Sequence, residues 1–307
     1  MRGAATTERR AGVAAARGWS VLASPGLLFV TPTILVLVLV VALPLVYSLV
    51  ISFSRFTFLT PRLDRFAGVD NYLKAFADRY FWNSFYVTVK YVVLVVGVEF
   101  LLGLLIALLL HGDLRFKGVY YAILTIPMVM SPVGVGLIWK MLLHPGLGVV
   151  NYVLSRLGIQ EVNWLGSPAM AFWSLLLVDV WQQISFMILV LLAGLVSLPR
   201  EPFEAAEIDG ANSLQRLWYV TVPLLKPVAL VAVLIRTIMA FRTYDLVYVM
   251  TRGGPGVSTD IISYYIYRTT FMGLDLAQAS AVSYLLLVVV LGLTAALFSA
   301  LLKQEAV

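Results

Sequence analysis

Cysteine is absent from this sequence, and histidine and charge are scarce. None of the 307 residues is cysteine, two are histidine and 12% are charged. Without cysteine, no disulfide framework or thiolate metal site can form, and His111 and His144 lie far apart in the sequence. No H-E-x-x-H run and no clear nucleophile with its base is present either. We therefore expect no metal site and no catalytic residue in this chain.

Apolar residues dominate the composition instead. They make up 61% of the chain, whereas soluble domains contain about 45–50%. A water-soluble fold of this length cannot bury so much apolar surface. The net charge of +6 fits basic flanks beside anionic lipid headgroups, because no basic run is longer than Arg9 and Arg10. We expect an integral membrane protein that spans the lipid bilayer and has no nucleic-acid partner.

Six stretches reach the length of about 20 residues that a helix needs to cross a bilayer. The expected spans are approximately 27–53, 82–110, 119–143, 169–195, 228–250 and 277–302. They divide the chain into a tail over 1–24, a six-helix domain over 25–302 and a short tail over 303–307. The uncharged run 18–54 is too long for the apolar core of a signal peptide, which favours a retained first span.

The sequence also indicates the shape of one span but leaves the direction of insertion open. Pro127, Pro132, Gly134 and Gly136 predict a kink in the third span, where neighbouring helices can satisfy the freed carbonyls. With the amino terminus inside, the inner segments hold ten Lys or Arg and the outer segments nine. The positive-inside rule therefore gives almost no preference for either orientation.

The segment 204–227, EAAEIDGANSLQRLWYVTVPLLKP, predicts a polar helical hairpin between the fourth and fifth spans. Glu204 favours the positive start of a helix, and Gly210 supplies a left-handed stop. Asn212, or the serine after it, can cap a second short helix that we expect to end near Pro223. Such a hairpin is suited to contact a partner, and an ordinary capped loop is the alternative.

This segment resembles the EAA loop in permeases of bacterial binding-protein-dependent ABC importers. The residues that match the family pattern are Glu204, Ala205, Ala206, Asp209, Gly210, Ala211, Pro223 and Pro227. Other runs within about 25–302 resemble the sugar-permease branch, among them 66–82, 144–154, 192–199 and 251–256. Arg252 stands where that branch usually has glycine.

The resemblance implies an all-α, type I ABC importer permease with six transmembrane helices in the bacterial plasma membrane and both termini in the cytoplasm. It implies that the loop over 199–227 docks into a cytoplasmic ATPase dimer, which would hold the ATP and magnesium. It further implies a second permease subunit as partner and a sugar delivered by an extracytoplasmic binding protein. The chain has no G-x-x-x-x-G-K-[ST] phosphate loop, so we expect it to bind no nucleotide and not to be an enzyme.

Ionisable residues within the expected spans are energetically costly, which makes each one a functional candidate. In the second span, Lys90 and Glu99 lie on opposite sides of the helix, so we expect Lys90 to snorkel and Glu99 to pair with another helix. In the fourth span, Asp179, Gln183 and Phe186 share a face. They offer a carboxylate, an amide and a ring, which together suit a sugar. Hydrogen bonding between helices is the alternative.

The fifth span contains two candidate arginines. Arg242 and Asp245 are three residues apart, which favours a buried ion pair within one helical turn. Arg236 lies nearer the cytoplasm, where we expect contact with the partner permease. The complete candidate substrate path is Asp179, Trp181, Gln182, Gln183, Phe186, Arg242, Tyr244, Asp245 and Tyr248.

Two transport mechanisms remain open on the residues alone. The first is an ATP-driven sugar importer. The second is an ion-coupled secondary transporter of a small polar solute, for which inverted repeats and discontinuous helices are expected and are not evident in the sequence. For the first, the resemblance favours a disaccharide of the maltose or trehalose type, ahead of monosaccharides, polyols and glycerol phosphodiesters.

Overall fold

The computed structural model describes residues 25–63, 65–112 and 115–305, so the expected tail over 1–24 lies outside the described residues. Within these ranges the regular structure is helical, with no strand. The elements are α2 Pro25–Leu37, the π-helical η1 Val38–Ala42, α3 Leu43–Ser52, α4 Asp70–Ala77, α5 Arg79–His111, α6 Lys117–Val129, α7 Pro132–Leu142, α8 Val149–Arg156, α9 Pro168–Val196, α10 Glu201–Ile208, α11 Ser213–Arg216, η2 Leu217–Thr221, α12 Val222–Phe241, α13 Asp245–Met250, α14 Ile262–Tyr267, η3 Arg268–Met272 and α15 Leu276–Glu305.

Five of the helical runs are long and apolar enough to cross a membrane, and α6 with α7 makes a sixth if the two count as one span. The five are Phe29–Ser52, Arg79–His111, Pro168–Val196, Ser213–Met250 and Leu276–Ser299. These runs confirm the expected all-α membrane fold. Short helices also form in the segments between the expected spans, namely α4, α8 and α14.

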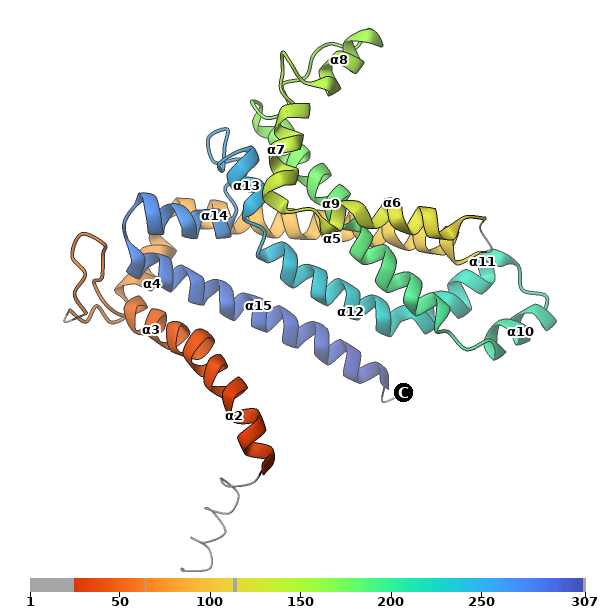
Figure 1. The fold of residues 1–307 in the computed structure, drawn as a ribbon, viewed down its shortest axis with the longest axis horizontal. Helices are drawn as coiled ribbons and strands as arrows, with labels where there is room; N and C mark the ends of the chain where they lie inside the picture. Colours follow the sequence, from red (N-terminus) through yellow and green to blue (C-terminus); the bar gives the residue numbers. More distant parts are fainter. Residues whose placement is uncertain (1–24, 64, 113–114, 306–307) are drawn as a thin grey trace, which may run out of the picture.

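Helix α9 packs against α5, α6, α7, α12 and α13, and α15 packs against α12 and α3. Close approach to α5 requires glycine at position 103, because a Cβ there would lie 2.8 Å from Cγ of Met187 on α9. In Figure 1 the hairpin formed by α10 and α11 lies at one end of the bundle, and α4 and α14 lie at the other end. The two ends are therefore available for different partners.

The kink predicted in the third span is a complete break. The axes of α6 and α7 differ by 96°, and Met130 adopts an extended conformation between them. Pro132 accounts for the position of the break, because proline excludes the helical conformation for the residue before it. Gln182 on α9 donates a hydrogen bond of 3.1 Å to the carbonyl of Met130, which satisfies one backbone group at the break.

The fifth span is present, as expected, but its helix is interrupted. Helix α12 ends at Phe241, and a second helix, α13, starts only at Asp245. The Oγ of Ser263, in α14, donates a hydrogen bond of 2.9 Å to the carbonyl of Phe241, which the helix end leaves without an intrahelical partner. A neighbouring element thus stabilises this break, as one stabilises the break between α6 and α7.

The hairpin has the predicted helix–corner–helix shape. Gly210 has a φ of 75°, and the amide of Ala211 donates to the carbonyl of Ala206, which closes a Schellman turn. Asn212 and Gln215 then form a capping box at the start of α11. The second helix does not end near Pro223, however. It continues through η2 into α12, and Pro223 is the second residue of α12, directly after the π-helical turn.

Candidate functional site

A buried network of charged side chains joins three of the long helices. Arg236 on α12 has its Nε 2.5 Å from Oε2 of Glu99 on α5, and its Nη2 lies 2.7 Å from Oδ2 of Asp179 on α9. The hydroxyl of Tyr91 donates a hydrogen bond of 2.8 Å to the same Asp179 oxygen. Arg236 is 1% exposed, and both carboxylates are buried. The network therefore connects α5, α9 and α12 at the centre of the protein.

This network confirms one expectation and corrects another. Glu99 pairs with another helix, as predicted. Arg236 does not lie free for a partner permease, because two carboxylates bind it inside this chain. The Oδ2 of Asp179 accepts from Arg236 and Tyr91, which is the hydrogen bonding between helices given as the alternative for this residue. Removing Arg236 would leave two buried carboxylates without their cation, which costs about 3–5 kcal/mol.

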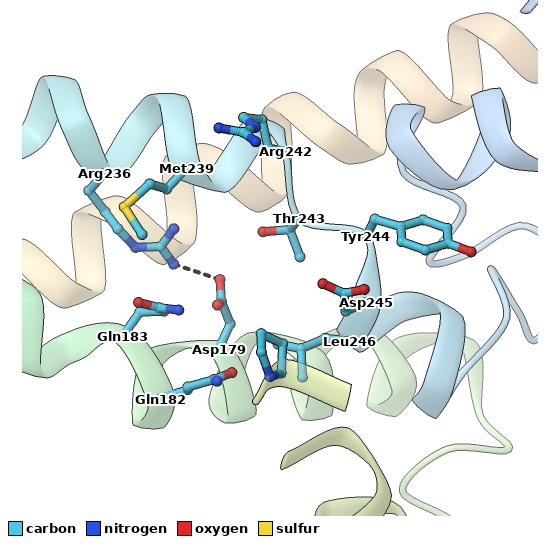
Figure 2. Close-up of a pocket in the computed structure, with 11 residues that line it drawn as sticks. Asp179, Gln182, Gln183, Arg236, Met239, Arg242, Thr243, Tyr244, Asp245 and Leu246 are labelled. Carbon is cyan, nitrogen blue, oxygen red and sulfur yellow. Dashed lines mark hydrogen bonds and ion pairs between the residues drawn. The ribbon is translucent and has the colours of Figure 1, made fainter. Parts of the chain in front are cut away.

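A small cavity lies beside the network, where the two breaks meet. Its volume is about 150 Å³. It is lined by Pro132, Asp179, Gln182, Gln183, Arg236, Met239, Arg242, Thr243, Tyr244, Asp245 and Leu246. Figure 2 shows these residues converging from α9, from the end of α12 and from the start of α13. Ligand sites commonly measure about 300–1,000 Å³, so this cavity is smaller than the usual range.

Arg242 and Asp245 line this cavity as free charges. The expected ion pair between them is absent, and neither side chain forms an ion pair with any other described residue. The spacing of three residues brings side chains together only on a continuous helix, and here α12 ends before Arg242. Arg242 and Asp245 thus present an unpaired guanidinium and an unpaired carboxylate at the cavity, and both groups can bind hydroxyl groups.

A third polar group at the cavity comes from Gln182. Its side chain is buried, and its Oε1 has no hydrogen-bond partner among the described residues, whereas its Nε2 donates to Met130. A buried acceptor without a partner costs about 1–3 kcal/mol. A hydroxyl group in the cavity would supply the missing donor.

The structure brings together most of the candidate path, although not all of it. Six of its members line the cavity: Asp179, Gln182, Gln183, Arg242, Tyr244 and Asp245. Trp181, Phe186 and Tyr248 do not, and the ring of Trp181 packs instead against Trp139. Arg236, Thr243 and the apolar residues Pro132, Met239 and Leu246 also line the cavity and were not predicted to do so. The position of Thr243 depends on the break after Phe241, which no residue pattern indicated.

The hairpin is the second candidate site, and it is poorly covered by its own chain. No residue of α10 or α11 is buried. Ile208 is 87% exposed at the end of α10, and Leu214 in α11 is also exposed. An eight-residue helix is marginal in isolation, and the described chain does not cover these two apolar side chains. The matched residues Glu204, Ala205, Ala206, Asp209, Gly210 and Ala211 all belong to this hairpin.

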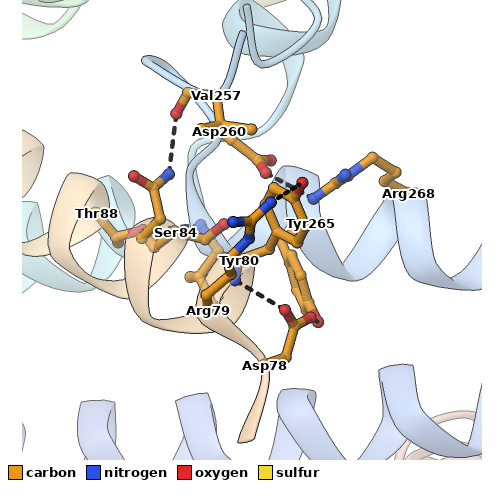
Figure 3. Close-up of polar contacts among 11 residues, drawn as sticks. Asp78, Arg79, Tyr80, Ser84, Thr88, Val257, Asp260, Tyr265 and Arg268 are labelled. Carbon is orange, nitrogen blue, oxygen red and sulfur yellow. Dashed lines mark hydrogen bonds and ion pairs between the residues drawn. The ribbon is translucent and has the colours of Figure 1, made fainter. Parts of the chain in front are cut away.

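A further group of polar side chains lies at the opposite end of the bundle. Asp260 forms an ion pair of 2.8 Å with Arg268, and the hydroxyl of Tyr265 donates to Asp78 over 2.6 Å. Figure 3 shows these residues between the start of α5 and the region of α14. Burial raises the pKa of the Asp260 carboxyl, and the nearby Arg268 partly opposes this rise. These contacts fix α14 to α5, outside the spans.

No group of three or more potential metal ligands occurs within 25–63, 65–112 and 115–305. The described chain therefore offers polar and aromatic groups for binding, and its two candidate sites contain no side-chain arrangement suited to holding a metal ion.

Comparisons with known proteins agree with this architecture. The chain is 40% identical to the trehalose/maltose transport system permease protein MalF of Thermococcus litoralis, over 88% of this chain and 90% of that protein. It is 36% identical to the sulfoquinovosyl glycerol transport system permease protein SmoG of Agrobacterium fabrum, over 87% of each. A bacterial alginate ABC transporter, solved with an alginate pentasaccharide-bound periplasmic protein, contains a chain of the same fold. That chain has a TM-score of 0.79 at 24% identity, and the match covers 92% of this chain and 96% of that one.

The family model for binding-protein-dependent transport system inner membrane components matches residues 99–306. This match includes the helix-rich core, the cavity and the hairpin. The chain therefore belongs to the family of binding-protein-dependent transport system inner membrane components, the permeases of ABC importers.

Proposed function

We propose that this chain is one of two permease subunits of an ATP-driven sugar importer. The observation on which the proposal rests is the cavity at the two helix breaks, where Arg242, Asp245 and Gln182 have polar groups without partners in the described chain. Sugar hydroxyls both donate and accept hydrogen bonds, so they match a guanidinium, a carboxylate and an amide oxygen together. Relatives named for trehalose, maltose and sulfoquinovosyl glycerol support a sugar as the solute.

The small size of the cavity supports a second permease as partner. A cavity of about 150 Å³ is below the usual range for a ligand site, so a facing subunit would complete the wall. The solved alginate transporter, which carries a periplasmic protein with bound sugar, supports delivery by an extracytoplasmic binding protein.

The hairpin supports coupling to a cytoplasmic ATPase dimer, which would hold ATP and magnesium. In this proposal α10 docks into the ATPase, and Gly210 sets the corner that presents it. The end of the bundle with α10 and α11 is then cytoplasmic, and the end with α4 and α14 faces outward. Both chain termini are cytoplasmic in the same orientation.

Helix breaks by themselves do not favour an ion-coupled transporter over an ABC importer. Discontinuous helices are expected for the ion-coupled class, and the structure has two helix breaks near the cavity. Family membership favours the ATP-driven class. The energy source is therefore the property to measure.

The test is uptake by proteoliposomes that contain this chain with its partner permease and ATPase, with the binding protein and sugar outside. We expect uptake with ATP inside the vesicles and none with a proton gradient alone. Gly210→Pro should abolish ATP-dependent uptake and release the ATPase from the complex, because proline cannot adopt a φ of 75°. Gly210→Ala is the matched control, with a strain of about 1–2 kcal/mol at most. Uptake driven by the gradient without ATP would overturn the proposal.

A further inference from the structure

A row of aromatic rings begins at the cavity and runs away from it. The row consists of Tyr244, Tyr267, Phe271 and Phe58, and Tyr248 packs beside its inner end against both Tyr244 and Tyr267. Ring centroids are 5.5 Å apart for Tyr244 and Tyr248, 5.1 Å for Tyr244 and Tyr267, 5.1 Å for Tyr267 and Phe271, and 6.5 Å for Phe271 and Phe58. Each ring is thus within contact range of the next.

The row has a direction relative to the bundle. Tyr244 lines the cavity, and Figure 2 shows its ring pointing away from Asp179 and Arg236. Tyr267 ends α14, and Phe271 lies in η3, at the end of the bundle opposite to α10 and α11 in Figure 1. The row therefore connects the cavity with the end that faces outward under the proposed function.

Burial along the row distinguishes it from ordinary core packing. Tyr264, which contacts Tyr244 and Tyr267 from the side, is buried in the core. The outer rings are not, because Phe271 is 60% exposed and Phe58 is 46% exposed. These two exposed rings lie nearly parallel, with an interplanar angle of 21°. A large part of each of these two side chains is thus left uncovered by the described chain.

We propose that this aromatic row is an entry track for the pyranose rings of a linear oligosaccharide. This inference depends on the proposed function, and it specifies the solute as a linear oligosaccharide. A pyranose has an apolar face of C–H groups that stacks on an aromatic ring, and hydroxyl edges that reach polar groups beside it. Successive rings at 5.1–6.5 Å offer successive platforms, so a sugar of two or more units contacts more of the row than a single unit does.

The chain offers a matched pair of variants to test the track. Phe271→Leu removes a ring of the row and keeps an apolar side chain. Phe298→Leu is the control, because Phe298 is similarly exposed, at 52%, and lies on α15 outside the row. Both positions are exposed, so both variants should fold with an unchanged unfolding midpoint.

The measurement is the KM of ATP-driven uptake for glucose, trehalose, maltose and maltotriose in the reconstituted complex. Phe271→Leu should raise the KM for maltotriose by about threefold to tenfold, the effect of losing one aromatic contact. The rise should be smaller for the two disaccharides and smallest for glucose, and Phe298→Leu should leave all four values unchanged.

Two results would count against the track, and they differ from failure of the proposed function. Normal uptake with the same KM for every sugar in Phe271→Leu would overturn the track alone. So would an equal rise for all sugars in both variants, which indicates a general structural effect. No ATP-driven uptake of any of the four sugars by the unmodified complex would overturn the proposed function as well.

Discussion

Arg236 and Arg242 are only six residues apart in the sequence, but their side chains have opposite environments. Arg236 is buried and bound by Glu99 and Asp179. Arg242 is exposed at the end of α12, lines the cavity and has no ion-pair partner among the described residues. The residue type is the same, so the helix break after Phe241 makes the difference. A charge paired across helices stabilises the fold, whereas a charge left at a break remains available to a solute.

The largest expected effect is loss of the paired arginine. Arg236→Met leaves Glu99 and Asp179 as buried carboxylates without their cation, which should lower the free energy of unfolding by about 3–5 kcal/mol. Denaturant unfolding of the purified chain in detergent measures this loss. The control replaces all three groups with neutral ones, Glu99→Gln, Asp179→Asn and Arg236→Met. If the single variant is as stable as this triple variant, the network does not stabilise the fold as a charged unit.

The next effect distinguishes Asp179 from Gln183, two of the residues on α9 that line the cavity. Asp179→Ala removes the acceptor of Tyr91 and one partner of Arg236, and Glu99 still pairs with the arginine. We expect a loss of about 1–3 kcal/mol in unfolding free energy. Gln183→Ala should leave stability within about 0.5 kcal/mol and change the KM of uptake. Equal stability for both variants would contradict the assignment of Asp179 to the network.

A smaller effect concerns the ion pair of Asp260 and Arg268, where the arginine is partly exposed. Because burial raises the pKa of Asp260, the folded state binds a proton more readily than the unfolded state. Above the pKa that Asp260 has in the folded state, its carboxyl is ionised there, which lowers the free energy of unfolding. This loss becomes smaller as the pH falls through that pKa. The stability of the natural chain relative to Asp260→Asn should therefore increase on acidification from neutral pH. A decrease over the same range would contradict the sign of the shift.

The smallest effect on stability is expected at the free charges. Arg242→Ala and Asp245→Asn remove no ion pair within the described chain, so the unfolding free energy should change by about 0.5 kcal/mol or less. Their effect on transport should be large, because a hydrogen bond to a charged group contributes about 1.5–3 kcal/mol, which corresponds to a tenfold or greater rise in KM. Destabilisation above 2 kcal/mol without a change in KM would reverse the comparison between the two arginines.

Hydropathy predicted the spans well because a helix in a bilayer needs a fixed length of apolar residues, and six stretches have it. Cap residues likewise predicted the hairpin, since Gly210 and Asn212 act through local backbone geometry. The breaks escaped prediction for two different reasons. Pro132 indicates where a helix bends and not by how much, and the break after Phe241 has no proline or glycine to indicate it.

The network and the cavity were predictable only in part, because they depend on contacts between distant residues. Glu99 was expected to need a partner, but Arg236 lies 137 residues away in the sequence. The error at Arg242 and Asp245 came from applying helix spacing across a break. A residue spacing has a geometric meaning only when the element that contains it is continuous.

Docking of α10 into an ATPase is tested most directly by crosslinking, since the natural chain has no cysteine and single sites can be introduced cleanly. Ile208→Cys in the hairpin should crosslink to the nucleotide-binding subunit in membranes. Leu147→Cys is equally exposed, at 88% against 87%, and lies between α7 and α8, away from the hairpin. It should give no such product. Absence of the crosslink from Ile208→Cys, or equal crosslinking from both positions, would contradict a coupling role for the hairpin.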